Sequence, residues 1–120
     1  MTAYNRQDYI AEAIESVLAS TYKNFELIIS DDCSSDQTLE IARGFALKDE
    51  RIKVFVNEKN LGDYPNRNKA ASYARGKYIQ YIDSDDLLHN LEIFPSYQLL
   101  LECPNSAVNH RNRYIEYTSL

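Results

Sequence analysis

The stretch FELIISDD, residues 25–32, joins a compact apolar run to two consecutive aspartates. The run from Phe25 to Ile29 has the length and composition of a strand that is buried on both faces, and Ser30 ends it. The pattern therefore predicts a buried strand with Asp31 and Asp32 just past its carboxyl end.

An amphipathic helix is expected on each side of this strand. Before it, apolar residues recur at helical spacing within residues 6–20, and Asn5 is placed to cap the first turn. After it, Ser34 and Gln37 have the spacing of a capping box, and an apolar face follows over residues 39–46. The strand is thus predicted to lie between two helices in the chain.

The same alternation continues along the chain. Residues 52–56 are predicted to form a strand, residues 66–75 a short helix that Gly76 ends, and residues 77–82 a third strand, which Asp83-Ser84-Asp85-Asp86 follows. Alternating helices and strands are typical of an α/β sheet. Since ligands bind at the carboxyl edge of such sheets, both acidic clusters are expected at the ligand-binding edge.

The two ends of the chain fit this alternation less well. Residues 1–5 have the pattern of the last part of a strand whose beginning is absent. Residues 109–113 are polar and basic without clear periodicity. We therefore expect a fragment, or a chain with segments outside the given sequence.

Composition excludes several classes of protein. A formal net charge of -5 argues against binding to a nucleic-acid backbone, which needs a basic surface. No apolar run reaches the roughly 18 residues of a membrane span, and polar residues after Met1 do not form a signal peptide. Cys33 and Cys103 are too few for a disulfide framework or a zinc site. We expect a cytoplasmic protein with reduced thiols that binds no nucleic acid.

The two acidic clusters are candidate metal sites. Clustered carboxylates repel one another unless a cation or hydrogen-bond donors offset the charge. Hard oxygen ligands suit Mg²⁺ or Mn²⁺ that also contacts phosphates. The alternative interpretation is that these aspartates cap helices or are solvated loop charges. Because each cluster follows an apolar strand, we favour a site.

Short motifs at residues 2–6, 25–36, 60–62, 66–70, 76–79 and 83–86 follow one another in a set order. Together they resemble the nucleotide-sugar-binding half of family-2 glycosyltransferases, over roughly residues 1–89. The resemblance implies the GT-A fold, a Rossmann-like three-layer sandwich with a mainly parallel sheet, here truncated. Residues 90–120 would be the start, or a remnant, of the acceptor-side region.

The resemblance also implies a nucleotide-sugar donor, and we expect a UDP-sugar. The donor-binding residues that it implies are Thr2, Ala3, Tyr4, Asp32, Arg67, Asp83, Ser84 and Asp85. The first three would line the base pocket, with Tyr4 stacking on the uracil. Asp32 would accept a hydrogen bond from the base or ribose, and Arg67 would face the diphosphate or base. Asp83 and Asp85 match an Asp-X-Asp motif and would hold Mn²⁺ or Mg²⁺. Asp83 would lie near the ribose or the metal, and Asp85 would be the metal ligand towards the diphosphate.

The implied reaction is inverting transfer of the sugar to a hydroxyl of a glycan or another acceptor, as in polysaccharide or cell-surface glycan synthesis. The metal and Arg67 would stabilise the leaving diphosphate, and a carboxylate would take the acceptor proton. Residues 90–120 contain Glu92, Glu102 and Glu116 but no base motif of the family, so no catalytic base is assigned. Peripheral membrane association through regions outside this chain stays open.

Other functions fit parts of the pattern. Residues 27–32 also resemble the first strand of a phosphorelay receiver, a signalling module that binds Mg²⁺, with Asp83 as the phosphoacceptor. However, no apolar strand ending in Lys follows Asp83. A sugar-phosphate nucleotidyltransferase would need a Gly-rich, basic loop where this chain has residues 5–8. His89 and His110 fit surface or capping roles better than metal binding.

Overall fold

The strands that the structure describes form one parallel sheet. The computed structural model describes residues 1–88, in which β1 (Thr2–Ala3), β2 (Leu27–Asp31) and β3 (Ile52–Val56) pair in the order β1-β2-β3. Thr2 lies opposite Ser30, and β3 pairs with β2 along its whole length. All strands point the same way, so their carboxyl ends share one edge.

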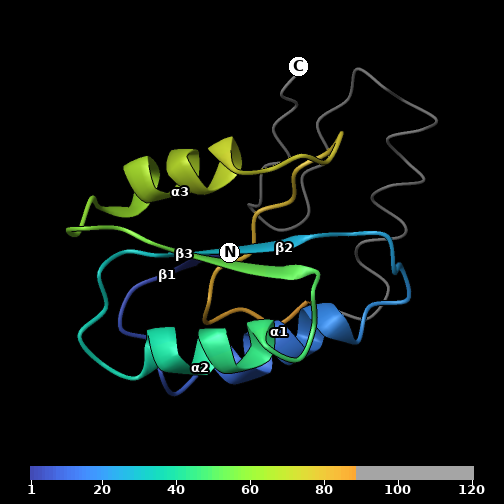
Figure 1. Cartoon of the computed structure of the whole chain (residues 1–120), viewed down its shortest axis with the longest axis horizontal. Coiled ribbons are helices and arrows are strands. Elements are labelled where there is room, and N and C mark those ends of the chain that lie inside the picture. Colours follow the sequence, from blue (N-terminus) through green and yellow to red (C-terminus); the bar gives the residue numbers. More distant parts are fainter. Residues whose placement is uncertain (89–120) are drawn as a thin grey trace.

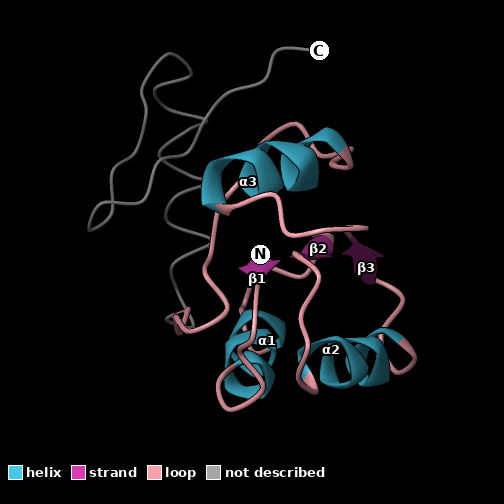
Figure 2. Cartoon of the chain, turned by 90° about the vertical axis from the view of Figure 1, so that its left-hand side faces the viewer, coloured by secondary structure: helices cyan, strands magenta, loops and turns pink. Residues whose placement is uncertain are grey.

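The helices lie on both faces of this sheet. Helices α1 (Ile10–Leu18) and α2 (Thr38–Ala46) cover one face, and α3 (Asp63–Ser72) covers the other (Figures 1 and 2). The predicted three-layer α/β arrangement with a parallel sheet is therefore confirmed. No helix in the part of the chain that the structure describes is both long and apolar enough to cross a membrane.

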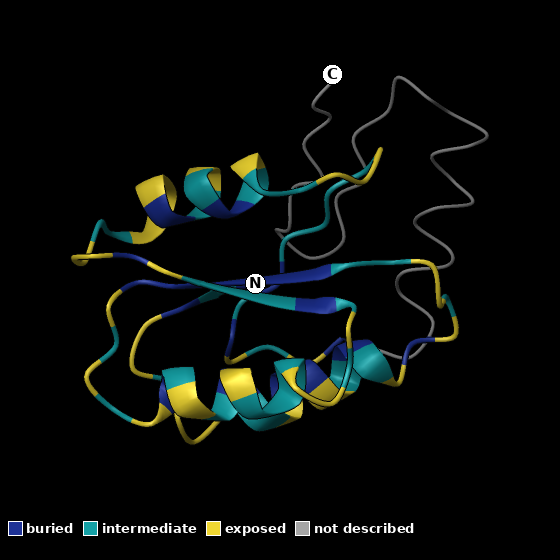
Figure 3. Ribbon diagram, in the orientation of Figure 1, coloured by how far each residue is buried: buried dark blue, intermediate teal, exposed yellow. Residues whose placement is uncertain are grey.

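The core lies between β2 and the helices α1 and α2. Every residue of β2 is buried, and Ile29 at its centre is fully inaccessible. Ile10, Ile14 and Val17 of α1 face the same core. Figure 3 shows the buried residues along the sheet and on the inner faces of the helices. Burial of each such side chain contributes about 1.5–3 kcal/mol to folding.

The predicted cap of the first helix is wrong. Helix α1 begins at Ile10, and Asn5 lies in the preceding loop with a φ of 51°. The side-chain oxygen of Asn5 accepts the N–H of Ser35 at 2.9 Å instead of an N–H of the helix. A tertiary contact between two loops has replaced the local cap.

The predicted capping box of the second helix is wrong for the same reason. The hydroxyl of Ser34 accepts the N–H of Asn5 at 3.0 Å, and α2 begins only at Thr38. Asp36 accepts the N–H of Thr38 at 2.9 Å, so Asp36 satisfies the first turn.

The predicted third strand, residues 77–82, is not a strand in the structure. Only an isolated parallel bridge forms, between Thr2 and Asp83. Among residues 1–88, no strand pairs with residues 77–81. Helix α3 also starts and ends earlier than predicted, so Gly76 does not cap it.

Candidate functional site

Both predicted acidic clusters lie at the carboxyl edge of the sheet. Asp31 ends β2 and Asp32 follows it, while the bridge from Thr2 to Asp83 brings the second cluster beside β1. Across this edge, the segment at Asp83 lies beside β1, followed by β2 and β3, and all of them run parallel. The expectation that Asp32 and Asp83–Asp85 share one edge is confirmed. Their roles in donor binding stay predictions.

Asp32 is buried and holds the loop that precedes α3. Its Oδ1 accepts the N–H of Leu61 at 2.8 Å and the amide of Asn57 at 2.7 Å, and its Oδ2 accepts the N–H of Gly62 at 2.9 Å. Gly62 has a φ of 87°, which favours glycine at this turn. Asp32 therefore fixes the loop that carries the start of α3, besides any contact with a ligand.

A buried polar network that the sequence did not reveal joins this edge to α3. Asn66 of α3 accepts the hydroxyl of Ser30 at 2.7 Å and the amide of Asn57 at 2.9 Å, and its own amide donates to the carbonyl of Ser30 at 3.1 Å. Asn57 in turn binds Asp32. The network orients α3, which carries Arg67. The sequence offered one signal for this network, because Asn57 directly follows the strand predicted at residues 52–56.

Arg67 lies between two carboxylates. Its Nε is 2.7 Å from Oδ1 of Asp63, and its Nη2 is 2.6 Å from Oδ1 of Asp83. Burial acts to lower the pKa of Arg67, but the hydrogen bond with Asp63 and the charges of Asp83 and Asp63 outweigh it and raise the pKa. The guanidinium is thus a fixed positive charge beside the Asp-X-Asp motif.

Arg6, which was not among the predicted site residues, pairs with the other aspartate of the motif. Its Nε lies 3.2 Å from Oδ2 of Asp85. Its Nη1 donates to the carbonyls of Tyr4 and Asn5 at 3.2 and 3.1 Å. The pairing joins residues far apart in sequence, so no local pattern indicated it.

Asp83 and Asp85 fit a site for Mg²⁺ or Mn²⁺. Both carboxylates reach solvent, with side-chain exposures of 40% and 46%. Among residues 1–88, no three His, Cys, Asp or Glu side chains gather closely enough to hold a metal by themselves. Mg²⁺ is commonly bound by one or two carboxylates and takes its other ligands from phosphates and water. The donor set matches that kind of site.

The remaining predicted donor residues differ in their exposure. Tyr4 is exposed at the edge, as a stacking side chain requires, and Thr2 is half-buried. The side chain of Ala3 belongs to the hydrophobic core, and Ser84 is buried. Ala3 and Ser84 would therefore contact a ligand mainly through their backbone groups.

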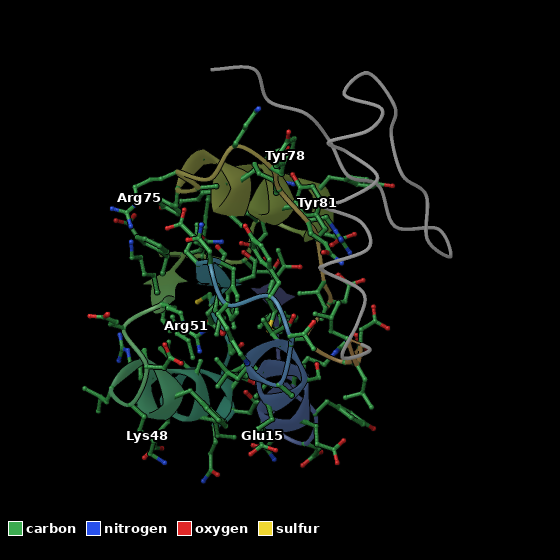
Figure 4. The ribbon with its side chains drawn as sticks, turned by 90° about the vertical axis from the view of Figure 1, so that its right-hand side faces the viewer. Glu15, Lys48, Arg51, Arg75, Tyr78 and Tyr81 are labelled. Carbon is green, nitrogen blue, oxygen red and sulfur yellow. The ribbon has the colours of Figure 1, made fainter. Side chains whose placement is uncertain are left out.

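A cavity among the described residues lies elsewhere. Its volume is about 740 Å³, and it is lined by the start of β2 and by residues 74–82, with none of the predicted donor residues. Figure 4 labels Arg75, Tyr78 and Tyr81 of this segment, which lie on the α3 side of the sheet. Because none of the predicted donor residues lines this cavity, the acidic edge is the better candidate site.

The predicted acceptor-side region, residues 90–120, lies outside the described residues. So do His89, His110, Cys103 and the glutamates Glu92, Glu102 and Glu116.

Comparisons with known proteins identify the family. The model of glycosyl transferase family 2 matches residues 1–118. The chain belongs to this family. The resemblance in the sequence is thereby confirmed, and the family replaces the interpretation as a phosphorelay receiver.

Individual similar proteins agree with this. The chain is 39% identical over 117 residues to the Escherichia coli UDP-Glc:alpha-D-GlcNAc-diphosphoundecaprenol beta-1,3-glucosyltransferase WfaP, covering 97% of the chain and 45% of WfaP. The crystal structure of S. aureus TarS 1-349 in complex with UDP has 32% identity and a TM-score of 0.78, covering 84% of this chain and 30% of that one.

A second similar structure supports the fold alone. The mannosyltransferase PcManGT from Pyrobaculum calidifontis, in complex with GDP-Man and Mn2+, has a TM-score of 0.80 at 20% identity, covering 91% of this chain and 34% of that one. The neighbours are GT-A glycosyltransferases, so the predicted GT-A fold is confirmed. The chain spans less than half the length of WfaP and about a third of each of these structures.

Proposed function

We propose that this chain is the donor-binding part of a glycosyltransferase that uses a UDP-sugar. The observation that carries the proposal is the carboxyl edge, where the Asp-X-Asp aspartates lie beside β1 and each aspartate is paired with an arginine. Carboxylates and guanidinium groups at one edge suit a diphosphate bound with a divalent cation. TarS, at 32% identity, has been solved with UDP, which supports uracil as the base.

Different residues of the chain would bind different parts of the donor. Tyr4 would stack on the uracil, and the half-buried Thr2 would lie beside it at the end of β1. Asp32, which already holds Leu61 and Gly62, would accept one further hydrogen bond from the base or ribose, since each carboxylate oxygen has two lone pairs. Arg67 would hold its place through Asp63 and face the diphosphate.

Asp83 and Asp85 would hold Mn²⁺ or Mg²⁺. When bound, the cation would neutralise negative charge on the leaving diphosphate, which is how metals assist such transfers. Arg67 would add a fixed positive charge on the same group, without reorganisation at the moment of reaction. The acceptor would be a hydroxyl of a glycan or another molecule, reacting with inversion at the anomeric carbon. The residue that takes its proton is not assigned.

Calorimetric titration of UDP with and without Mn²⁺ tests the proposal. We expect Mn²⁺ to tighten UDP binding, and Asp85→Ala to abolish that tightening because a hard oxygen ligand is lost. Glu50→Ala is the matched control, since Glu50 is an exposed acid between α2 and the start of β3, at the amino end of the sheet. Equal UDP affinity with and without Mn²⁺, or a full response to Mn²⁺ in Asp85→Ala, would contradict the assignment.

A further inference from the structure

The two arginines hold the Asp-X-Asp carboxylates in unequal ways. Arg67 is shared between Asp63 and Asp83, at 2.7 and 2.6 Å, so it stays held if one carboxylate leaves. Among residues 1–88, Arg6 has Asp85 as its one carboxylate partner, at the longer distance of 3.2 Å. Both members of the Arg6–Asp85 pair are nearly half exposed, at 43% and 46%. Exposed pairs of this kind are weak and separate readily.

The backbone nevertheless fixes the position of Arg6. Its Nη1 donates to the carbonyls of Tyr4 and Asn5, and its own N–H donates to the hydroxyl of Thr38 at 2.7 Å. Asn5 is tied to the next loop, since its side chain accepts the N–H of Ser35. The guanidinium therefore keeps its place at the edge if Asp85 turns to another partner.

A divalent cation and Arg6 compete for the same carboxylate. Asp85 is a hard oxygen ligand in the candidate metal site, and its Oδ2 already contacts Arg6. A cation that binds Asp85 must displace this contact or share the carboxylate at a cost in repulsion from the guanidinium. An incoming diphosphate changes the balance, because it offers anionic oxygens both to the cation and to the released arginine.

We propose that Arg6 is the exchangeable counter-ion of Asp85. In the donor-free protein it occupies this carboxylate and weakens metal binding. When the diphosphate arrives, Asp85 turns to the cation and Arg6 turns to the phosphates. Arg6 thus couples metal binding to donor binding. This inference rests on the proposed function, because it needs a diphosphate donor at this edge.

The inference predicts opposite effects from one substitution. Without nucleotide, Arg6→Gln removes the competitor, so Mn²⁺ should bind about two- to fivefold more tightly, as the loss of a weak exposed pair allows. Without metal, the same variant should bind UDP more weakly, since a cation beside the diphosphate is gone. A residue that only stabilised the fold would not strengthen binding of Mn²⁺.

The experiment measures free Mn²⁺ by electron paramagnetic resonance during titration of the nucleotide-free chain, and UDP affinity by calorimetry. Arg6→Lys keeps the charge and should stay close to the unmodified chain in Mn²⁺ affinity. Arg43→Gln, at an exposed position on α2, is the matched control for loss of a positive charge. In an Asp85→Asn background, Arg6→Gln should no longer change Mn²⁺ affinity, because the contested carboxylate is absent.

The outcomes separate the two proposals. If UDP binds to the unmodified chain and Arg6→Gln leaves Mn²⁺ affinity unchanged or lower, the inference about Arg6 is overturned and the proposed function stands. Absence of Mn²⁺ binding to both proteins also overturns it. If UDP does not bind to the unmodified chain with or without Mn²⁺, the proposed function fails instead. Thermal melting followed by circular dichroism checks the fold, and Arg6→Met, which keeps the apolar stem, replaces Arg6→Gln if that variant does not fold.

Discussion

Nη2 of Arg67 lies 2.6 Å from Oδ1 of Asp83, and Nε of the same guanidinium lies 2.7 Å from Asp63. One side chain of α3 thus spans from its own helix to the acidic cluster beside β1. The contact ties the position of Asp83 to the position of α3. Anything that moves α3 therefore also moves a predicted metal ligand and the positive charge beside it.

Arg67→Ala should weaken UDP binding by about 1.5–3 kcal/mol, the usual range for a hydrogen bond to a charged group. The loss would be roughly 10- to 100-fold in dissociation constant. Calorimetry in the presence of Mn²⁺ measures it. Asp63→Ala is the control, because it removes the other partner of Arg67 without removing the guanidinium, and its effect should be smaller. Equal losses in the two variants would argue that Arg67 acts only by fixing α3.

Asp32→Asn should destabilise the fold as well as weaken UDP binding. An amide has one acceptor oxygen, so its NH₂ group would face a donor, either the N–H of Gly62 or the groups of Leu61 and Asn57. The cost in the free energy of unfolding should be about 1–3 kcal/mol. Urea unfolding measures the stability and calorimetry the affinity for UDP.

The exposed Asp8 provides the control for this variant, because Asp8→Asn removes a similar charge without touching the loop. The response of UDP binding to Mn²⁺ should persist in Asp32→Asn, since Asp85 is intact. Unchanged stability would mean that the carboxylate of Asp32 does not fix the loop at residues 60–62. Unchanged UDP affinity would remove Asp32 from the predicted base pocket.

Asn66→Ala should cost about 1–3 kcal/mol of stability, because the hydroxyl of Ser30 and the amide of Asn57 would lose a buried acceptor. Asn68→Ala on the same helix is the matched control, since Asn68 is exposed and the helix propensities change equally. Urea unfolding of both variants gives the comparison. Equal stabilities would show that the network around Asn66 contributes little to the fold.

The part of this edge that could be predicted from the sequence is local. The apolar run before Asp31 and Asp32 has a strand pattern, and buried parallel strands put such a pair at the carboxyl edge. The positions of Asp32, Asp83 and Asp85 followed from that pattern and from the order of the motifs. Strand β3 was predicted with the bounds that the structure has, because its alternation is equally local.

The parts that the sequence did not reveal depend on contacts between distant residues. Asn5 has the chemistry of a helix cap, yet the N–H of Ser35 competes for its side chain and prevails. Residues 77–82 have strand composition, but a strand needs a neighbouring backbone, and β1 offers only Thr2 as a bridge partner for Asp83. The Arg6–Asp85 pair likewise depends on the fold, which brings the two loops together.

The ion pair of Asp49 and Arg51 predicts an acid-dependent loss of stability. The side chain of Arg51, and next its backbone N–H, hold the pKa of Asp49 at about 2, against 3.8 for a free carboxyl. Since the folded-state pKa is lowered, the contribution is complete above pH 3.8 and is lost as the pH falls through about 2. Asp49→Asn should therefore be less stable than the unmodified chain at pH 5, with a gap that narrows towards pH 2.

Urea unfolding at intervals from pH 5 to pH 2 measures this gap. Comparing the two proteins at each pH removes the contribution of the other carboxylates, which titrate in both. A gap that stays constant over this range would show that the Asp49 carboxylate is not stabilised in the folded state.

The last prediction is that this chain binds UDP but does not support acceptor-dependent transfer. The residues predicted to bind the donor lie at one edge of the sheet, whereas no base motif of the family is found in residues 90–120. Transfer needs the acceptor hydroxyl held near the anomeric carbon with a base within reach. Binding needs neither. The chain also spans only 45% of the length of WfaP, so much of what the relative uses lies outside the matched part.

One preparation serves for both measurements, a UDP titration in the presence of Mn²⁺ and an assay of UDP release from UDP-glucose or UDP-GlcNAc with mixed glycan acceptors. Binding without release is the expected result, because the donor pocket can form while the acceptor proton has no base. Asp85→Ala again serves as the control for donor binding. Acceptor-dependent release well above that of Asp85→Ala would show that a base is present among residues 90–120, and Glu92, Glu102 and Glu116 would then be substituted one at a time to find it.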